Sequence, residues 1–394
     1  MKPIIFIIAS VAVIGLFSIV WTRPSLPTVT PSLKDRFQSA LDSLRQEYRL
    51  PGATAAYRLP DGTVEIVASG KADPELDIPM SPQSRMLAAS IGKTFVAATA
   101  IALAQEGKLH LDDPLAKWLG GRFWFSRLPN HDQITLRHLL THSAGIANHV
   151  ELAAFQRLFR EHWQDDGPPL PPDSLIALVL DRPPLFEPGE GWHYSDTGYL
   201  LIGLIIEAAS GNSYYEEVER RWIKPLQLQL TAPSNRRELP GLAAGYLSPD
   251  NAFGLPAKTT LRPGLMAWHP GLEWTGGGLV SNPGDLVRWA GALYEGRAME
   301  GEYLTILLYS VPVSADAPAV RYGLGVAIHR DGPLGTTYGH AGWIPGYCSS
   351  LRYYPETGIA VSFQINTDIG IADGETPVME QMEAGLAKIV LEGL

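Results

Sequence analysis

The sequence predicts an α/β protein of the α+β kind, in which an antiparallel sheet is flanked by N- and C-terminal helices and carries an inserted, mostly helical subdomain. Two observations predict this class. Strand-like stretches lie near both ends of the chain, at residues 52–70 and 322–368, whereas helical patterns dominate residues 90–210 between them. No internal repeat and no long linker divides the sequence, so we expect both ends to contribute to one sheet.

The first predicted elements are a helix and a hairpin. Ser32 is a candidate N-cap for this helix. The stretch 52–70 then alternates as two strands around a Pro-Asp-Gly turn at residues 60–62. The apolar stripe of the helix consists of Leu33, Phe37, Leu41, Leu44 and Tyr48.

The end of the chain predicts consecutive antiparallel strands within residues 322–330, 336–355 and 358–368, and then an amphipathic helix from residue 377. The α/β part of the domain is therefore expected to comprise residues 25–88 and 270–394, and the helical part residues 89–269.

Composition excludes several classes of protein. The chain has 394 residues, of which 45% are hydrophobic and 18% charged, so it can bury a large core and is not broadly disordered. Its formal net charge of -10 argues against a nucleic-acid binder, which would present a basic face. The single cysteine, Cys348, permits no internal disulfide.

Residues 1–24 predict a membrane anchor or a signal segment. The run Pro3–Trp21 carries no charge, and as a helix it would span roughly 28 Å, close to the thickness of a bilayer core. No clear cleavage site follows it, which favours an uncleaved anchor over a cleaved signal and over a buried helix. No cysteine follows it for lipid attachment, and Lys2 and Arg23 flank it too evenly to set an orientation. Either an anchor or a signal would direct the export of residues 25–394 to a bacterial-type cell envelope. An anchored protein would face the periplasm or the exterior, and a cleaved one would be secreted.

The stretch AASIGKTFVAATAIALAQEG, at residues 88–107, predicts an apolar helix with Gly107 at its C-terminus. Near its start, Ser90 and Lys93 are three residues apart and so share one face of the helix. A serine hydroxyl is a weak nucleophile until a neighbouring base takes its proton, and a lysine in an apolar pocket can be that base. The pattern S-x-x-K is weak evidence alone, because a chain of this length contains about one by chance.

Two further motifs make the interpretation of Ser90 and Lys93 as nucleophile and base more specific. Tyr194-Ser195-Asp196 precedes a strongly apolar helix, at what is expected to be an exposed loop–helix junction, and His340-Ala341-Gly342 lies in a predicted strand. With Ser90 and Lys93, they resemble the S-x-x-K, Y-x-N and K-T-G or H-x-G motifs of the serine β-lactamase and penicillin-binding protein family. The resemblance is to its branch of class C β-lactamases, D-alanyl-D-alanine carboxypeptidases and esterases, and covers about residues 32–392. Further similar stretches are LDDPLAKWLG, ITLRHLLTHSAGI and WTGGGLVSNPGDLVRWAGAL.

The resemblance implies the fold of the β-lactamases and transpeptidases and a role for each motif residue. Ser90 would form an acyl-enzyme, and Lys93 and Tyr194 would share the proton transfers. The strand edge at residues 340–342 (His340, Ala341 and Gly342) would hold the substrate, and the backbone N–H groups of Ser90 and Trp343 would form the oxyanion hole. The resemblance implies no metal and no organic cofactor.

Two positions depart from the family pattern. Asp196 stands where Asn is common, and a carboxylate beside Lys93 would favour the charged amine, which makes Tyr194 the better candidate for the base. Asp196 has an alternative reading as the N-cap of the following helix. His340 stands where many β-lactamases carry lysine, and an uncharged histidine attracts a substrate carboxylate less strongly, which disfavours an efficient β-lactamase.

Several other patterns are better explained by structure than by chemistry. His138 and His142 are four residues apart on a predicted helix, but the glutamate of a zinc-peptidase motif is absent. Lys258–Thr260 resembles K-T-G but lacks its glycine, so we expect this stretch to be a loop. Tyr199 and the apolar run at residues 200–206 are expected to form the core side of a helix. Cys348 is expected to be a buried apolar residue. Trp192 and Trp274 fit a cleft or the core equally well.

These observations predict a serine hydrolase that acts through an acyl-enzyme on a small peptide or ester, with cell-wall D-alanyl-D-alanine peptides as the leading substrate. The alternatives are a carboxylic esterase or D-amino-acid peptidase of the same family, a non-catalytic protein that binds peptidoglycan or a partner, and a weak β-lactamase.

Overall fold

The computed structural model describes residues 31–164, 167–371, 374 and 376–393. The predicted anchor or signal segment, residues 1–24, lies outside the described residues. Among the residues that are described, no helix is both long and apolar enough to cross a membrane.

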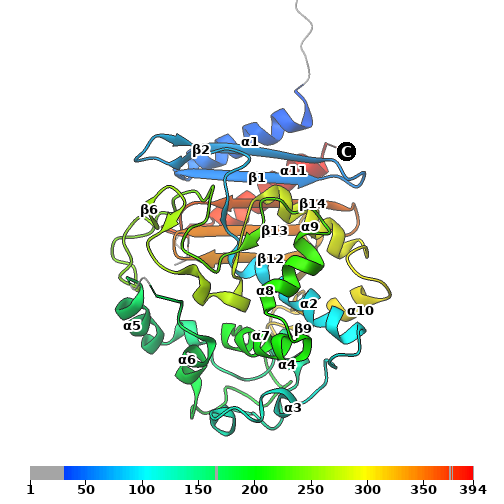
Figure 1. Cartoon of the computed structure of the whole chain (residues 1–394). Helices are drawn as coiled ribbons and strands as arrows, with labels where there is room; N and C mark the ends of the chain where they lie inside the picture. Colours follow the sequence, from blue (N-terminus) through cyan, green and yellow to red (C-terminus); the bar gives the residue numbers. More distant parts are fainter. Residues whose placement is uncertain (1–30, 165–166, 372–373, 375, 394) are drawn as a thin grey trace, which may run out of the picture.

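A nine-stranded sheet, in the order β3-β2-β1-β14-β13-β12-β11-β10-β9, forms the upper half of the molecule (Figure 1). All of its strand pairs are antiparallel, and β1 from the start of the chain pairs with β14 from its end. The predicted sheet built from both chain ends is therefore confirmed. Its strands are β1 (Gly52–Arg58), β2 (Val64–Asp73), β3 (Ile78–Pro79), β9 (Val311–Pro312), β10 (Val320–Tyr322), β11 (Ala327–Gly332), β12 (Gly335–Ile344), β13 (Tyr347–Tyr354) and β14 (Ile359–Ile365).

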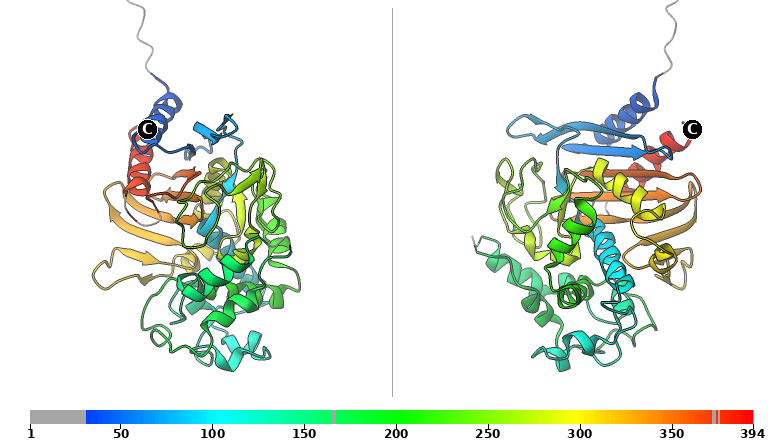
Figure 2. Two further views of the ribbon diagram at one scale, coloured as in Figure 1. Left: turned by 90° about the vertical axis from the view of Figure 1, so that its left-hand side faces the viewer. Right: turned by 45° about the vertical axis from the view of Figure 1, so that its right-hand side comes forward.

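Helices α1 (Leu33–Glu47) and α11 (Val378–Leu391) lie side by side against one face of this sheet (Figure 2). Ser32 caps α1 as predicted, because its hydroxyl accepts a hydrogen bond from the N–H of Asp35 and the Asp35 carboxylate returns to the Ser32 N–H. Phe37 and Leu41 are the fully buried members of the predicted stripe. Helix α9 (Pro283–Tyr294) packs on β1, β13 and β14.

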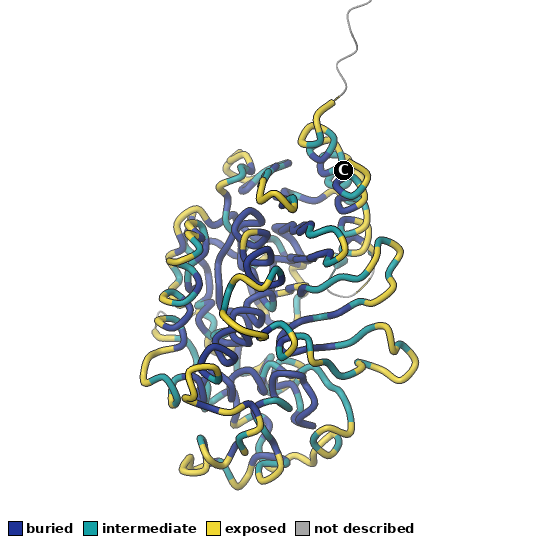
Figure 3. Tube along the Cα trace, turned by 90° about the vertical axis from the view of Figure 1, so that its right-hand side faces the viewer, coloured by how far each residue is buried: buried dark blue, intermediate teal, exposed yellow. Residues whose placement is uncertain are grey.

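The remaining helices gather below the sheet in Figure 1. Their central members are α2 (Lys93–Gln105) and α7 (Asp196–Ser210), which are buried over most of their length because they are apolar on every side. Buried segments fill the interior in Figure 3, and the exposed ones lie at the periphery, in loops and on the outer sides of helices such as α1. The shorter helices are α3 (Leu115–Leu119), α4 (Leu136–Leu140), α5 (Ala153–His162), α6 (Pro172–Ile176), α8 (Tyr214–Val218) and α10 (Tyr303–Leu307).

The last part of the predicted helical insert differs from the expectation. Residues 232–269 contain no helix and fold into turns and short strands. Two small sheets account for these strands, in the orders β4-β8-β5 and β6-β7. Their members are β4 (Met86–Leu87), β5 (Ala232–Pro233), β6 (Thr260–Arg262), β7 (Leu265–Met266) and β8 (Leu279–Ser281).

Candidate active site

Ser90 lies on a tight turn between strand β4 and helix α2. The helix predicted from residue 88 begins as a 3-10 helix, Ala89–Gly92, and becomes an α-helix only at Lys93. Ala89 has a φ of 50°, in the left-handed region that residues with a Cβ rarely adopt. The turn also packs closely on β12, since a Cβ on Gly342 would lie 2.4 Å from the Ala88 carbonyl oxygen. Ser90 is thereby held, partly exposed, on a strained and closely packed turn.

Lys93 is fully buried, and its amine makes three hydrogen bonds. Its Nζ lies 3.0 Å from the Ser90 Oγ, 2.5 Å from the Asp196 Oδ1 and 2.5 Å from the Gly276 carbonyl oxygen. The predicted neighbourhood of Ser90, Lys93 and Asp196 is therefore present. The Asp196 carboxylate is the ion-pair partner of this buried amine.

Tyr194 closes the other side of this group. Lys93 Nζ lies 4.8 Å from the centroid of the Tyr194 ring. The exposed junction predicted here is wrong for the phenol, because the Tyr194 hydroxyl oxygen is buried and no described residue gives it a normal hydrogen bond. Burial raises the pKa of Tyr194 well above 10, and the Asp196 charge raises it further, although the nearby Ser90 hydroxyl opposes both effects. Tyr194 is therefore a neutral phenol.

Ser195, rather than Asp196, is the N-cap of helix α7. The Ser195 hydroxyl accepts a hydrogen bond from the N–H of Gly198, and Asp196 is the first residue of the helix. The alternative reading of Asp196 as the cap is therefore wrong, and its carboxylate is free to bind Lys93.

Residues 340–344 of β12 form an edge beside the Ser90 turn. Strand β11 pairs with β12 only as far as Gly339, so among the described strands this segment pairs with β13 alone. Ala341 and Trp343 are exposed on it. The His340 side chain is buried instead, with its Nε2 2.8 Å from the Tyr322 hydroxyl. Burial, supported by the charge of Lys93, lowers the pKa of His340 to about 3, so the ring is neutral.

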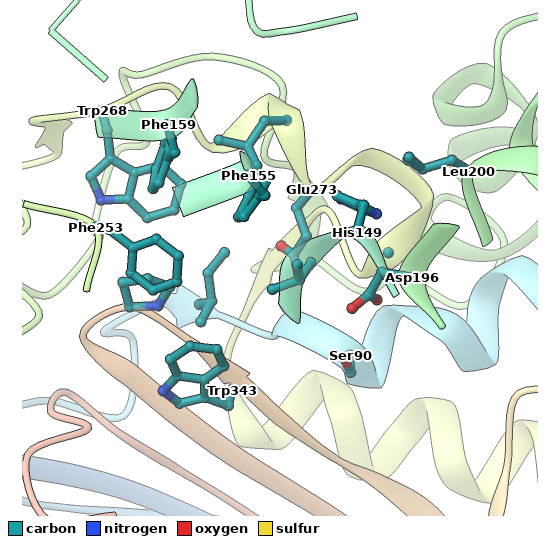
Figure 4. Close-up of a pocket in the computed structure, with 15 residues that line it drawn as sticks. Ser90, His149, Phe155, Phe159, Asp196, Leu200, Phe253, Trp268, Glu273 and Trp343 are labelled. Atoms are coloured by element: carbon teal, nitrogen blue, oxygen red, sulfur yellow. The ribbon is translucent and has the colours of Figure 1, made fainter. Parts of the chain in front are cut away.

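A pocket opens from Ser90 between helix α5, the turns at residues 250–272 and the end of β12 (Figure 4). We call its aromatic lining the aromatic wall. Ring centroids of neighbouring members lie 5.6–6.3 Å apart, typical of edge-to-face and offset contacts. The aromatic wall consists of Phe155, Phe159, Phe253, Trp268 and Trp343.

Two polar residues of the pocket were not predicted. The His149 ring lies 3.1 Å from the Thr197 hydroxyl, and burial lowers the pKa of His149 to about 4. Glu273 lies between two short 3-10 helices, Pro270–Leu272 and Trp274–Gly276, and its Oε2 is buried without a hydrogen-bond partner among the described residues. Neither residue belongs to a motif, so only the three-dimensional structure reveals them.

The other sequence patterns have structural explanations. His138 lies in α4 and accepts a hydrogen bond from the N–H of Thr135, but His142 lies beyond the helix, so the predicted helical pair is wrong. His142 instead accepts a hydrogen bond from the N–H of Ser195 and packs on Tyr194, with 4.2 Å between ring centroids. No group of three candidate metal ligands occurs in the part of the chain that the structure describes.

The remaining patterns contribute no side chain to the group of Ser90, Lys93 and Tyr194, although the Trp192 ring packs on Tyr194 with 6.5 Å between ring centroids. Lys258 forms ion pairs with Asp73 and Glu75. Cys348 is buried, which raises the pKa of its thiol. Trp192 and Trp274 are not among the residues that line the Ser90 pocket, and of the helix-core run only Leu200 reaches it.

A serine hydroxyl bonded to a buried amine, next to a phenol and at one end of an apolar pocket, is the arrangement of a serine hydrolase. The family model described as Beta-lactamase matches residues 37–385. The chain therefore belongs to the β-lactamase family of serine hydrolases, as the resemblance implied.

Several known proteins are similar to most of this chain. Penicillin-binding protein 4* of Bacillus subtilis is 27% identical over 288 residues, which cover 70% of this chain and 59% of that relative. A D-stereospecific amidohydrolase from Streptomyces is 30% identical, with a TM-score of 0.74, and the match covers 89% of this chain and 98% of that one. A D-amino acid amidase from Ochrobactrum anthropi, complexed with L-phenylalanine amide, is 26% identical, with a TM-score of 0.75 and coverage of 92% and 98%.

Proposed function

We propose that the protein hydrolyses small amides or esters whose acyl part carries a bulky apolar group, through an acyl-enzyme on Ser90. The observation that carries this proposal is the aromatic wall, which adjoins Ser90 in one continuous pocket (Figure 4). Burying an aromatic group there would stabilise its complex by about 1.5–3 kcal/mol. Similarity to a D-stereospecific amidohydrolase and a D-amino acid amidase supports the same substrate class.

The geometry suggests how the proton transfers are divided. Lys93, as the neutral amine, takes the proton of Ser90 while Oγ attacks the substrate carbonyl. Tyr194 protonates the leaving group and regains a proton from Lys93. The same groups then activate the water that releases the acid. The sequence favoured Tyr194 as the base for the first step. We assign this step to Lys93 instead, because ionising the buried Tyr194 phenol beside Asp196 is costly.

D-Alanyl-D-alanine carboxypeptidase activity is the second candidate, supported by the similarity to penicillin-binding protein 4*. Its substrate ends in a carboxylate, which requires a cationic partner. None of the described residues that line the pocket is Lys or Arg, and His340 is neutral and buried. An amide or ester without that carboxylate fits this pocket better.

A matched pair of p-nitrophenyl esters tests the proposal. We expect kcat/KM for the 3-phenylpropanoate to exceed that for the acetate by about tenfold or more, the factor that 1.4 kcal/mol of ring burial gives. Phe155→Ala should lower this ratio, whereas Phe123→Ala, at a ring that is 82% exposed, should leave it unchanged. Equal rates for the two esters would refute the proposed acyl group, and faster cleavage of a D-alanyl-D-alanine peptide would favour the second candidate.

We also propose, from the uncharged run Pro3–Trp21 alone, that the protein is exported and stays attached to a membrane. Membrane fractionation followed by intact-mass measurement should find the full-length mass of 42.9 kDa. A mature N-terminus near residues 22–26 would instead show a cleaved signal.

A further inference from the structure

Glu273 is a buried carboxyl group at the Ser90 pocket, and it contributes to none of the proton transfers described above. It links the two 3-10 helices at residues 270–276, and Figure 4 shows it between the aromatic wall and the pair Asp196 and Ser90. A Cβ built on Gly277 would lie 2.3 Å from both the Glu273 Oε1 and the Ala89 carbonyl oxygen. The Glu273 carboxyl therefore lies immediately beside the turn that carries Ser90.

This carboxyl has hydrogen-bonding capacity that the described protein does not use. Its Oε2 is buried without a partner, which is unfavourable for a polar atom. The Lys93 amine, whose charge acts on this carboxyl, is already engaged by Ser90, Asp196 and the Gly276 carbonyl oxygen. Burial raises the pKa of Glu273 to about 8, Lys93 opposes this rise, and Asp196 adds to it. A cationic group brought into the pocket would pair with the unpartnered Glu273 carboxyl.

The position of that cation follows from the reaction. The substrate carbonyl carbon must lie at Ser90, and its apolar side chain must lie on the aromatic wall. The carbonyl carbon and the apolar side chain are both attached to the same carbon, the one next to the carbonyl. Any third substituent on that carbon is therefore also held close to Ser90. The acidic groups that line this part of the pocket are Asp196 and Glu273.

We propose that Glu273 is a specificity-determining residue, which binds the protonated amino group on the carbon next to the scissile carbonyl. This inference rests on the proposed function and narrows its substrate class to amides and esters of amino acids with a free amino group and an apolar side chain. Three contacts, at Ser90, the aromatic wall and Glu273, also discriminate between enantiomers, because only one hand presents all three substituents at once.

The test compares D- and L-phenylalanine p-nitroanilide with 3-phenylpropanoic p-nitroanilide, which differs only in lacking the amino group. We expect the wild-type protein to prefer one phenylalanine enantiomer over the deamino compound by about tenfold or more in kcat/KM, since hydrogen bonds to charged groups are among the strongest in proteins. In Glu273→Gln this preference should fall to about threefold or less, mainly through KM. Glu300→Gln, the same change at an exposed residue, should keep it.

The outcomes separate this inference from the proposed function. If the deamino compound is cleaved and Glu273→Gln keeps the wild-type preference for the free amine, Glu273 does not bind the amino group. If wild-type protein shows no preference at all, the inference fails while the proposed function stands. If neither phenylalanine nor the deamino compound is cleaved faster than acetyl p-nitroanilide, the proposed function itself fails. Equal rates of fluorophosphonate labelling at Ser90 will show that each variant is folded.

Discussion

The two sides of the Ser90 pocket differ in how their amino and carboxyl groups are paired. On the side of helices α2 and α7, the Lys93 amine has three acceptors and Asp196 is its counter-ion, although the neutral Tyr194 hydroxyl beside it has no normal hydrogen bond among the described residues. On the side of the 3-10 helices, Glu273 has a buried oxygen with no partner, next to a wall of aromatic rings.

This difference separates chemistry from recognition. The paired Lys93 amine holds nucleophile and base in a fixed geometry, so little reorganisation is needed when the reaction begins. An unsatisfied group is unfavourable in the free protein, but a ligand that pairs with it gains affinity and selectivity. Substitutions on the first side should therefore change the rate for every substrate, and substitutions on the second side should change the choice of substrate.

Ser90→Ala should have the largest effect. Loss of the nucleophile should lower kcat/KM for every substrate by about 10⁵-fold or more, as for other enzymes that lose it. The partly exposed side chain loses a single oxygen, so the melting temperature should change little. Steady-state rates with p-nitrophenyl esters will measure the loss, and turnover at more than one per cent of wild type would show that Ser90 is not the nucleophile.

Tyr194→Phe should have the next largest effect. The phenol is neutral and buried beside Ser90, so its loss removes a proton donor while the ring still fills its place. We expect kcat to fall by about 10²–10⁴-fold, the usual scale for a general acid or base. The loss should be greater for an anilide than for a p-nitrophenyl ester, whose leaving group needs no proton. Equal losses would mean that Tyr194 does not protonate the leaving group.

Asp196→Asn should lower the rate without abolishing it. The substitution keeps the size of the side chain but removes the ion-pair partner of the buried Lys93 amine, so the amine is held less firmly beside Ser90. We expect kcat for p-nitrophenyl esters to fall by about tenfold, equivalent to about 1.4 kcal/mol. An unchanged rate would show that Asp196 is not coupled to the base.

Glu273→Gln should have the smallest effect of these substitutions. In the absence of substrate, we expect this effect as a change in the melting temperature. The pKa of Glu273 rises from 4.5 to about 8 on folding, so between these pH values the unfolded chain has lost a proton that the folded protein keeps. The free energy of unfolding of the wild-type protein therefore falls as the pH rises from 4.5 to about 8. Glutamine does not titrate. Glu273→Gln should therefore melt higher than wild type by about 2–5 °C at pH 8.5 and by much less at pH 5. A gain independent of pH would contradict a buried, titrating carboxyl.

The sequence predicted the first side of the pocket better than the second. Ser90 and Lys93 are three residues apart on one chain segment, so local geometry alone brings them together. The burial of His340 was not predicted, because the face of a strand that meets the core depends on its neighbours. In this structure, the hydrogen bond between His340 and Tyr322, on strand β10, holds the His340 side chain in its buried position.

The aromatic wall and Glu273 could not be predicted by such reasoning. Phe159, Phe253 and Trp343 come from segments far apart in the chain, and only the complete fold brings them to one surface. Glu273 looks like an ordinary turn residue in the sequence, because burial without a partner is a property of the packed structure. The overall sheet was easier, since strand periodicity and chain order were enough to predict one sheet from both chain ends, and the structure shows that β1 and β14 join them.

The most direct test of the central claim is to map the residue that becomes acylated. Folded protein should be treated with a fluorophosphonate and, separately, with a fluorescent penicillin, and any adduct located by peptide mass spectrometry. We predict one adduct on Ser90 with at least one probe, slowed when 3-phenylpropanamide occupies the pocket. An adduct on another residue, or none from folded protein with either probe, would contradict this account.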